Sequence, residues 1–260
     1  MNGEHVAFVT GGSRGIGAAI CRRLGRDGVT VLVAARSQDE CKAVAEEIRE
    51  RGGQAWPIAL DVADPDSVRA ALDEARLISS AIGPVDWLVN DAGIAESASL
   101  SASDEELYRR HMDVNFHGAR RLIEGFLSDM RERSYGRIVN IASSAGLRGY
   151  AYASAYCASK FALVGYTLAA APELKDSGVT MNVVCPHYVQ SPMLEASVPL
   201  VMEKTGMSEE QAREFFRSEN PGGRLVTMEE VAEAAWDALV EDYNGAILEL
   251  DGSGALRRRA

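Results

Sequence analysis

The stretch TGGSRGIG, residues 10–17, decides the fold prediction for this chain, because its four glycines stand directly after the short apolar run 6–10. A segment with the helical spacing of apolar residues begins at Gly15. Glycines lack a Cβ atom, so they let the backbone turn tightly and let a ligand approach it closely. The free N–H groups and the dipole at the start of a helix favour an anion such as a pyrophosphate. The stretch therefore predicts a strand, a phosphate-binding turn and a helix, although an ordinary tight turn would also explain the glycines.

Outward from this turn, short apolar runs alternate with longer segments of helical period. The apolar runs are residues 6–10, 29–34, 55–60, 85–89, 137–141, 179–185 and 246–250, and the helical segments are 15–26, 39–51, 66–80, 104–133 and 156–175. Such alternation predicts a parallel sheet covered by helices on both faces. We expect one doubly wound α/β domain of the Rossmann type over residues 1–260, with about seven strands. In such sheets the turn after the first strand binds a dinucleotide, and the spacing GxxxGxG is a variant of the GxGxxG fingerprint.

Composition narrows the classes of partner. The 260 residues include 27 Lys and Arg against 38 Asp and Glu, a formal net charge of −11, and 47% of them are apolar. An acidic balance argues against a protein that binds nucleic acid or an anionic membrane, since either partner would require a surplus of basic surface. Any phosphate group must therefore be held by a local site.

The cysteines and the N-terminal segment predict a cytoplasmic location. The four cysteines, Cys21, Cys41, Cys157 and Cys185, form no CxxC pair, which indicates reduced thiols rather than a disulfide framework or a metal site. The first residues lack the basic start and the long apolar region of a signal peptide. No stretch approaches the ~18 uninterrupted apolar residues of a membrane span.

Two arginines indicate which dinucleotide is bound. A site for NAD places an acidic side chain at the end of the second strand, on the 2′-hydroxyl of the ribose. This chain has Arg36 there and a further arginine, Arg14, within the glycine turn. Guanidinium groups offer forked, charged donors that match a 2′-phosphate. The pair predicts NADP(H), and the alternative is two solvated surface arginines.

Further ligand contacts are expected where the third and fourth strands end. Asp61 and Val62 follow the third strand, and Asn90, Ala92 and Gly93 follow the fourth. Open α/β sheets bind ligands at the carboxyl ends of their strands, so these residues are candidate adenine and ribose contacts. A tight turn at Gly93 would explain the second group equally well.

A tyrosine and a lysine lie one helical turn apart in the segment after the fifth strand. Of the eight tyrosines only Tyr156 has a lysine four residues later, Lys160. Side chains at i and i+4 share one face of a helix, so the ammonium group can favour the phenolate and lower the pKa of the phenol. Such a phenol can exchange a proton near neutral pH. The alternative is a Tyr/Lys pair on the surface of a helix.

An ordered set of motifs now carries a resemblance to a known family. TGGSRGIG begins at Thr10, LDV at Leu60, NDAG at Asn90, VNFHG at Val114, NIASSAG at Asn140, YCASK at Tyr156 and VVCP at Val183. Over nearly the whole chain this set resembles the short-chain dehydrogenase/reductase family. The resemblance implies that Ser143 polarises a carbonyl oxygen, that Tyr156 is the acid/base, that Lys160 binds the nicotinamide ribose and tunes Tyr156, and that Asn115 supports a proton-relay water. Ser144 is the neighbouring candidate, but Ser143 has the family's spacing to the tyrosine.

The same resemblance implies a set of cofactor contacts and an assembly. The expected contacts are Gly11, Ser13, Arg14, Gly15, Ile16, Gly17, Arg36, Asp61, Val62, Asn90, Ala92, Gly93, Tyr156, Lys160, Pro186 and Val189. Members of the family have a seven-stranded sheet and a lid after the sixth strand, and they are usually homotetramers, so a homotetramer or homodimer is expected. The motif of the family departs here at Asp91, usually asparagine, and at His187, usually glycine; His187 either contacts substrate or fills space.

Residues 190–221 are the expected lid. The strand rhythm ends there and an apolar and acidic helical stretch follows, with apolar positions at Met193, Leu194, Val198, Met202, Phe215 and Phe216. A cover of this kind suits an apolar substrate, whereas the alternative is an extra helix pair packed on the core or at a subunit contact.

Together these features predict an NADP(H)-dependent enzyme that transfers hydride between the nicotinamide and a carbonyl or secondary-alcohol carbon, with ketone or 3-oxoacyl reduction as the favoured direction. The first two-thirds of the chain resemble 3-oxoacyl-carrier-protein reductases and polyketide ketoreductases, and the end resembles hydroxyprostaglandin-type dehydrogenases. The alternatives are an NAD-dependent secondary-alcohol dehydrogenase and a dinucleotide-binding sensor without turnover.

Overall fold

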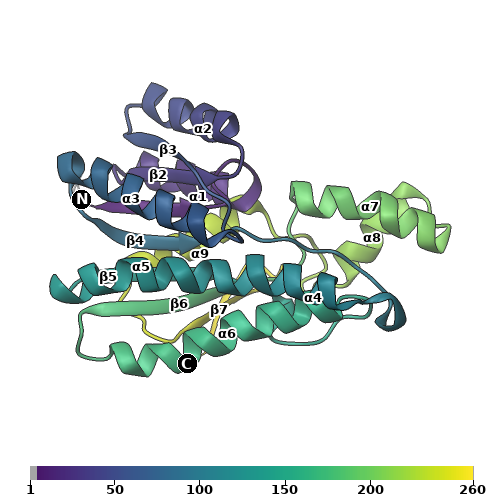
Figure 1. Ribbon diagram of the computed structural model, residues 1–260. Helices are drawn as coiled ribbons and strands as arrows, with labels where there is room; N and C mark the ends of the chain where they lie inside the picture. The colour runs from purple at the N-terminus through teal and green to yellow at the C-terminus, as the bar shows by residue number, and fades with distance from the viewer. Residues whose placement is uncertain (1–4, 260) are drawn as a thin grey trace.

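The computed structural model describes residues 5–259. In it all seven predicted apolar runs form parallel strands of one sheet (Figure 1). The strands are β1 (Val6–Thr10), β2 (Thr30–Ala35), β3 (Ala55–Ala59), β4 (Val85–Asn90), β5 (Gly136–Ile141), β6 (Val179–Pro186) and β7 (Ile247–Leu250). Their order across the sheet is β3-β2-β1-β4-β5-β6-β7, so the order reverses at β1 and β4. Strands buried on both faces read as continuous apolar runs, which is why the sequence located them.

An eighth strand, β8 (Leu256–Arg259), extends the sheet and runs antiparallel to β7. The prediction of about seven parallel strands is therefore confirmed, but the sheet contains one further, antiparallel strand that was not expected. The sequence of β8, LRRR, has no apolar alternation and all four residues are exposed. Its arginines are paired with acidic groups of the preceding segment: Arg257 lies 2.9 Å from Asp251, and Arg259 binds Glu249.

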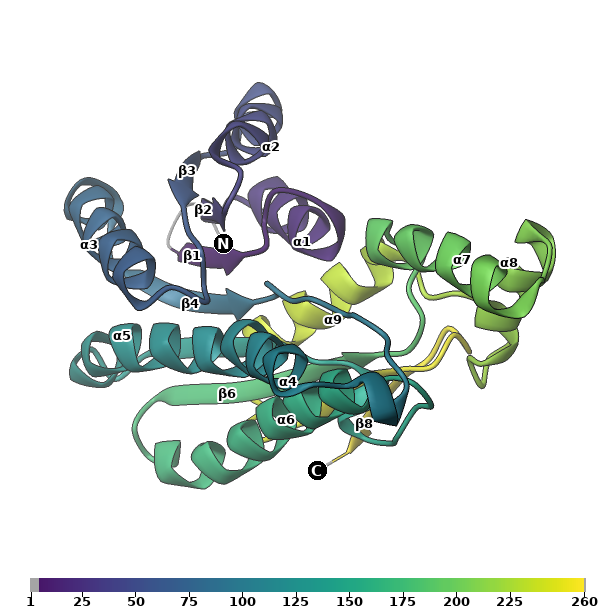
Figure 2. The ribbon, with the colours of Figure 1, turned by 45° about the vertical axis from the view of Figure 1, so that its right-hand side comes forward.

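Helices cover both faces of the sheet (Figures 1 and 2). They are α1 (Gly15–Arg26), α2 (Gln38–Glu50), α3 (Pro65–Ile82), α4 (Glu105–Met112), α5 (Gly118–Glu132), α6 (Ser154–Leu174), α7 (Pro192–Thr205), α8 (Glu209–Ser218) and α9 (Met228–Val240). One apolar core contains residues of α1, α2 and α9, and a second, on the other face, contains residues of α3, α5 and the end of α6. None of the helices in residues 5–259 combines the length and the apolar character needed to cross a membrane.

The single helix expected over residues 104–133 is divided. Between α4 and α5 lies one π-helical segment, Asp113–His117, and it places the Asn115 side chain in the interior with an exposed fraction of 1%. Single π turns inside α-helices insert one extra residue and occur often at functional sites. One extra residue shifts the spacing of the apolar residues only slightly. The sequence alone therefore does not reveal the π-helical segment.

Helix α9 was not expected at all. It follows the segment 190–221 and packs against α1. Its start carries a capping box, in which Thr227 and Glu230 each accept a hydrogen bond from the other's backbone N–H. The pattern T-x-x-E before an apolar run is a recognised start signal, so this helix could have been predicted.

Helices α7 and α8 project beyond the carboxyl ends of the parallel strands (Figures 1 and 2). They share a small apolar cluster of their own, formed by Leu194, Val198, Ala212 and Phe216. Pro192, the first residue of α7, lies beside the glycine turn. A Cβ atom on Gly15 would lie 3.7 Å from Cδ of Pro192. The segment predicted as a lid is therefore adjacent to the turn predicted to bind phosphate.

Candidate active site

The glycine turn joins β1 to α1 at the carboxyl edge of the sheet. Gly11 and Gly15 have φ values of 67° and 59°, which residues with a Cβ atom rarely adopt. A Cβ atom on Gly17 would lie only 2.3 Å from the carbonyl oxygen of Gly11. The N-cap residue of α1, Arg14, makes no side-chain capping hydrogen bond. Backbone N–H groups in the first turn of α1 are thus available to a phosphate group.

Arg14 and Arg36 are both exposed, one in this turn and the other directly after β2. Within residues 5–259 neither guanidinium takes part in an ion pair with a carboxylate, whereas most of the other arginines do. Ser13 is partly exposed in the same turn, and Ile16 in the first turn of α1 packs on the apolar core. The structure therefore leaves two cations and a polar turn open at one corner of the sheet.

The residues after β3 and β4 lie at the same edge. Asp61 is partly exposed and its Oδ1 accepts a hydrogen bond from the N–H of Ala63 at 3.0 Å, while Val62 is buried. Asn90 is 4% exposed and its Nδ2 donates to Oδ1 of Asn140 at 2.9 Å. The Nδ2 group of Asn90 thus joins β4 to β5 within the sheet, while its Oδ1 is buried and has no hydrogen-bond partner among residues 5–259.

The segment after Asn90 is held against β1. The hydroxyl oxygen of Thr10 accepts hydrogen bonds from the N–H groups of Asp91 and Ala92, each at 3.0 Å. A Cβ atom on Gly93 would lie 3.6 Å from Nζ of Lys160. The strand-end residues 90–93 therefore lie between the glycine turn and the catalytic candidates.

Ser143, Tyr156 and Lys160 come together from two elements. Ser143 follows β5, and Tyr156 and Lys160 are on one face of the first turns of α6. The Ser143 hydroxyl is hydrogen-bonded to the Tyr156 phenol. Nζ of Lys160 lies 5.9 Å from the ring centre of Tyr156 and donates to the carbonyl oxygen of Ile141 at 2.9 Å. The neighbouring Ser144 points elsewhere, with its hydroxyl 2.6 Å from that of Tyr150.

Electrostatics at Tyr156 differ from the expectation. Burial raises the pKa of Tyr156 to about 12, and the hydrogen bond to Ser143 only partly opposes this rise. The predicted lowering of this pKa by Lys160 is not seen, because Lys160 is itself buried and its own pKa is lowered by desolvation. The phenol is therefore protonated at neutral pH in this structure, and it is placed to donate a proton.

Asn115 closes the site from the π-helical segment. Its Oδ1 accepts from the N–H of Ile94 at 2.8 Å, and its Nδ2 donates to the Ile94 carbonyl at 3.0 Å and to the Ser159 hydroxyl at 2.9 Å. These bonds join the loop after Gly93 to α6. The side chain thus fixes the position of the loop beside Lys160.

Two further residues near this site were given no role from the sequence. The ring of His111 on α4 lies edge-on to Tyr156 with the ring centres 6.3 Å apart. Asp91, noted only as a departure from the motif, places its carboxylate against the glycine turn, 2.8 Å from where a Cβ atom of Gly17 would be. Only contacts distant in sequence reveal either placement.

His187 fills space rather than projecting into an open site. The residue is 7% exposed, and its Nε2 lies 2.9 Å from Oε1 of Glu249 on β7. Its φ is not in the positive region, so the backbone here does not require the usual glycine. Pro186 ends β6, and Val189, which is buried, forms a bridge to Val226. These two residues lead the chain from the sheet edge into α7.

No metal site is visible among residues 5–259, because nowhere in that range do three or more His, Cys, Asp or Glu side chains gather in a ligating arrangement. The four cysteines are all buried and free.

Comparisons with known proteins match this architecture. A model of the short chain dehydrogenase family matches residues 5–199. A putative ketoacyl reductase of Streptomyces coelicolor is 37% identical over 232 residues, 88% of each chain, and a D-beta-hydroxybutyrate dehydrogenase of Cupriavidus necator is 32% identical over 256 residues, 97% of this chain and 98% of that protein. The crystal structure of an actinorhodin polyketide ketoreductase variant with NADPH has a TM-score of 0.89 at 34% identity and covers 96% of each chain.

This chain belongs to the short chain dehydrogenase family. It is an oxidoreductase that acts on a carbonyl group or the corresponding alcohol, and the resemblance inferred from the seven motifs is confirmed.

Proposed function

We propose that the protein is an NADP(H)-dependent reductase of ketones or 3-oxoacyl compounds. The observation that carries the proposal is the convergence of Ser143, Tyr156 and Lys160 beside the glycine turn, at the edge where a doubly wound sheet binds its ligands. The relative named as a ketoacyl reductase and the polyketide ketoreductase structure support the substrate class. A protonated Tyr156 can supply the proton that reduction adds to the carbonyl oxygen.

The open cations and N–H groups fit a phosphorylated dinucleotide. The first turn of α1 would hold the pyrophosphate, and the unpaired Arg14 and Arg36 would bind the 2′-phosphate. The remaining proposed contacts are Gly11, Ser13, Gly15, Ile16, Gly17, Asp61, Val62, Asn90, Ala92, Gly93, Tyr156, Lys160, Pro186 and Val189. The nicotinamide, when bound, supplies or accepts the hydride.

The side chains of the candidate active site perform the remaining steps of the proposed reaction. Tyr156 donates its phenolic proton to the oxygen of the reacting carbonyl, and Ser143, hydrogen-bonded to that phenol, holds the oxygen in line. Lys160, fixed by the Ile141 carbonyl, would bind the nicotinamide ribose, and its Nζ lies 5.9 Å from the ring centre of Tyr156. Asn115 maintains the loop that borders Lys160.

Helices α7 and α8 form the proposed lid over this site. Pro192 at the start of α7 already lies near Gly15, and exposed Met193 and Phe215 present apolar surface from the two helices. An apolar substrate is therefore favoured. The single domain proposed over residues 1–260 includes this segment.

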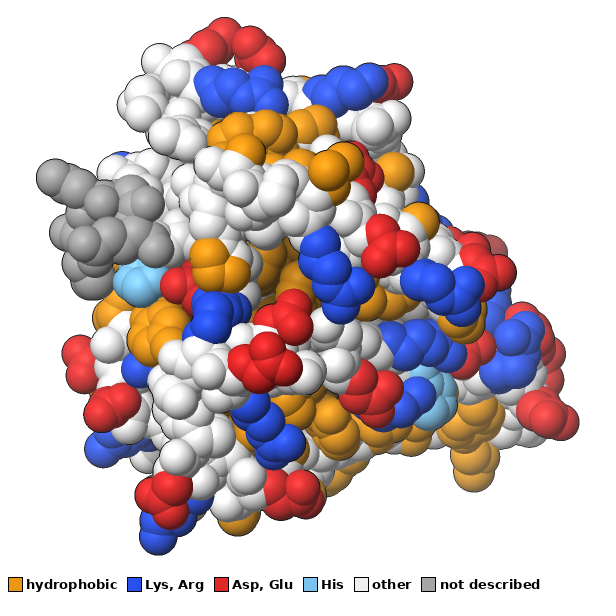
Figure 3. Space-filling view, turned by 60° about the vertical axis from the view of Figure 1, so that its left-hand side comes forward, with side chains coloured by type: hydrophobic (Ala, Val, Ile, Leu, Met, Phe, Trp, Pro, Cys, Tyr) orange, Lys and Arg blue, Asp and Glu red, His pale blue; other side chains and the backbone are white. Residues whose placement is uncertain are grey.

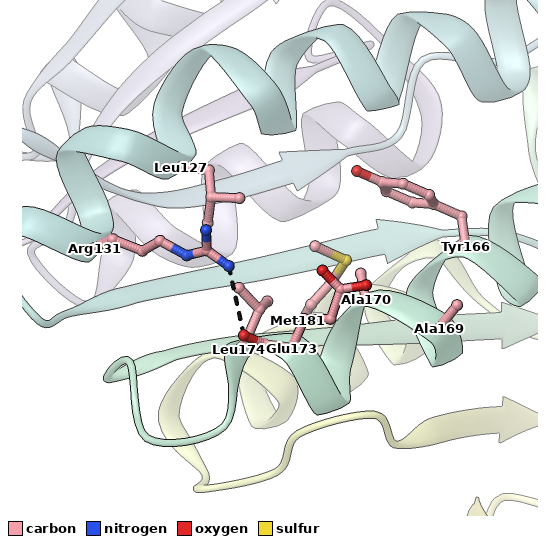
Figure 4. Close-up of a pocket in the computed structure, with 8 residues that line it drawn as sticks. All are labelled: Leu127, Arg131, Tyr166, Ala169, Ala170, Glu173, Leu174 and Met181. Atoms are coloured by element: carbon pink, nitrogen blue, oxygen red, sulfur yellow. Dashed lines mark hydrogen bonds between the residues drawn. The ribbon is translucent and has the colours of Figure 1, made fainter.

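The outer surface of α6 supports a homotetramer or homodimer. Phe161 and Leu168, seven residues apart, are 46% and 40% exposed. Beside them, a shallow pocket lies between α5, α6 and β6, lined mostly by apolar groups (Figure 4): Leu127, Arg131, Tyr166, Ala169, Ala170, Glu173, Leu174 and Met181. A helix that is apolar around its whole circumference is normally covered, and a second copy is the proposed cover.

Four buried free thiols accord with the proposed cytoplasmic location.

The test follows the consumption of NADPH and of NADH over a panel of ketones, diketones, 3-oxoacyl thioesters and cyclic ketones. We expect turnover with NADPH that falls by at least about a hundredfold in Tyr156→Phe, with a much smaller change in NADPH affinity, because the variant loses the proton donor but only one of the proposed cofactor contacts. Turnover with NADH alone would favour the NAD-dependent dehydrogenase. Tight NADPH binding with no turnover in either direction would favour the sensor.

Arg36→Asp tests the cofactor preference separately. Removing the forked donor and adding a negative charge should weaken NADPH binding and strengthen NADH binding, because the carboxylate repels a 2′-phosphate and accepts from a 2′-hydroxyl. Affinities are measured by nucleotide fluorescence. An unchanged NADPH affinity would remove Arg36 from the proposed site.

A further inference from the structure

Asp91 is an acidic residue beside the glycine turn, and its negative charge would oppose a bound pyrophosphate. It follows β4 directly, and its Oδ2 would lie 3.1 Å from a Cβ atom on Gly11 and 2.8 Å from one on Gly17. The backbone N–H of Gly17 is close enough to the carboxylate to favour its charged form and so lower the pKa of Asp91. Asp91 therefore places its charge at the positive end of α1.

The opposite side of this carboxyl group faces the catalytic candidates. Lys160 on α6 lies close enough to Asp91 that each alters the titration of the other, and Asp91 also raises the pKa of Tyr156 and of Cys21 on α1. These three are the titratable side chains of the packed elements that its charge affects. Asp91 thus joins the phosphate-binding turn to the catalytic lysine through a single carboxyl group.

We propose that binding of the dinucleotide is coupled to the uptake of one proton by Asp91, the carboxyl group between the glycine turn and Lys160. The inference rests on the proposed function, because it requires a pyrophosphate at the first turn of α1. A carboxylate and a pyrophosphate repel each other when both face the same N–H groups, whereas a neutral carboxyl group does not.

The environment makes this proton exchange accessible near neutral pH. Burial raises the pKa of Asp91, and the nearby Lys160 and the Gly17 N–H oppose the rise. The negative charge of a bound cofactor shifts the equilibrium further toward the neutral acid. The affinity for the dinucleotide is therefore highest at low pH, where Asp91 is already neutral. It falls as pH rises through the pKa of Asp91 in the protein without cofactor.

Asp91→Asn is the test variant, because asparagine has the shape of a neutral carboxyl group and cannot titrate. Dissociation constants for NADPH and NADH are measured between pH 6.5 and 9, and proton uptake is measured by calorimetry in two buffers of different ionisation enthalpy. NADH is included because it lacks the 2′-phosphate, whose own second pKa is about 6. Asp73→Asn is the matched control, since Asp73 is an exposed carboxylate on α3.

In the wild type and in Asp73→Asn we expect uptake of up to one proton with either nucleotide, and a loss of affinity with rising pH. The loss is about tenfold for each unit by which the cofactor raises the pKa of Asp91. In Asp91→Asn the uptake should vanish and the affinity should stay nearly constant.

Proton uptake that persists in Asp91→Asn would assign the proton to Lys160 and overturn the proposal. So would a wild-type protein that binds NADH with no uptake anywhere between pH 6.5 and 9, a measurement that does not depend on whether the variant folds. Failure of the wild type to bind either nucleotide would instead overturn the proposed function.

Discussion

At the scale of single residues, backbone atoms in the glycine turn leave no space for a side chain at Gly17. A Cβ atom on Gly17 would overlap the Gly11 carbonyl oxygen, at 2.3 Å, and approach Asp91 Oδ2, at 2.8 Å. The first contact involves backbone, which cannot move aside as a flexible side chain can. Glycine at this position is therefore a packing requirement of the turn as well as a feature of a phosphate-binding motif.

Gly17→Ala should lower the free energy of unfolding by about 1–3 kcal/mol, the usual cost of an atom forced into a packed site, and should weaken NADPH binding. Gly149→Ala is the matched control, because Gly149 has no positive φ and a methyl group added there would have no atom within 4 Å. Thermal unfolding and nucleotide titration are the measurements. Equal melting temperatures and affinities for both variants would contradict the packing argument.

The sequence predicted the residues of this site better than their energetics. Ser143, Tyr156 and Lys160 follow from motif spacing, and the structure brings them together. The direction of the Tyr156 pKa shift was wrong, because helical spacing reports that two side chains share a face and says nothing about how far burial removes both from water. Desolvation depends on residues distant in sequence.

At the scale of elements, α9 depends on a charged pair at its start. Arg224 donates from Nη1 and Nη2 to the two carboxylate oxygens of Glu230, at 2.8 and 2.5 Å, and Glu230 also accepts from the N–H of Thr227. The guanidinium and this N–H lower the pKa of Glu230 to about 2. The pair joins the loop after α8 to the helix that packs on α1.

Glu230→Gln should destabilise the protein at pH 7 by about 1 kcal/mol or less, because the pair is partly exposed and solvent screens it. Glutamine preserves the capping bond to Thr227, so the variant isolates the charge. The folded-state pKa lies below the unfolded value of about 4.3, so the stabilisation is complete above that value and is lost as pH falls toward 2.

Thermal unfolding from pH 7 down to pH 3 measures this effect, and the difference between wild type and variant should shrink along that series. Glu229→Gln is the control, because Glu229 is an exposed acidic residue in the same first turn. A difference that stays constant with pH would show that the charge of Glu230 is not the cause, and an equal effect of the control would assign the stabilisation to the helix dipole instead of the pair.

Elements were predicted well where a pattern repeats and poorly where a local change ends it. The buried parallel strands have continuous apolar runs, and their positions were found to within one or two residues. The division at 113–117 and the strand β8 were missed, because a single π turn leaves apolar spacing almost intact and β8 is held by ion pairs and edge pairing rather than by apolar burial.

At the scale of the whole molecule, the formal net charge is −11. On the face shown in Figure 3, acidic and basic side chains are interspersed with small apolar areas. That face offers no extended basic surface for nucleic acid. The proposed phosphate site is instead local, at the corner formed by the glycine turn, Arg14 and Arg36.

The proposed assembly makes the final prediction. Leu168→Glu places a carboxylate at an exposed apolar position of α6, next in sequence to the pocket residue Ala169. If a second copy covers this face, burying an unpaired charge there is costly, and sedimentation velocity should show a shift from tetramer or dimer toward monomer. Leu77→Glu is the control, because Leu77 on α3 is 74% exposed and a charge there displaces no proposed contact. A wild-type monomer, or an assembly that Leu168→Glu leaves intact, would show that the apolar face of α6 is not the contact between copies, and the exposed edge at β8 would then be the next surface to examine.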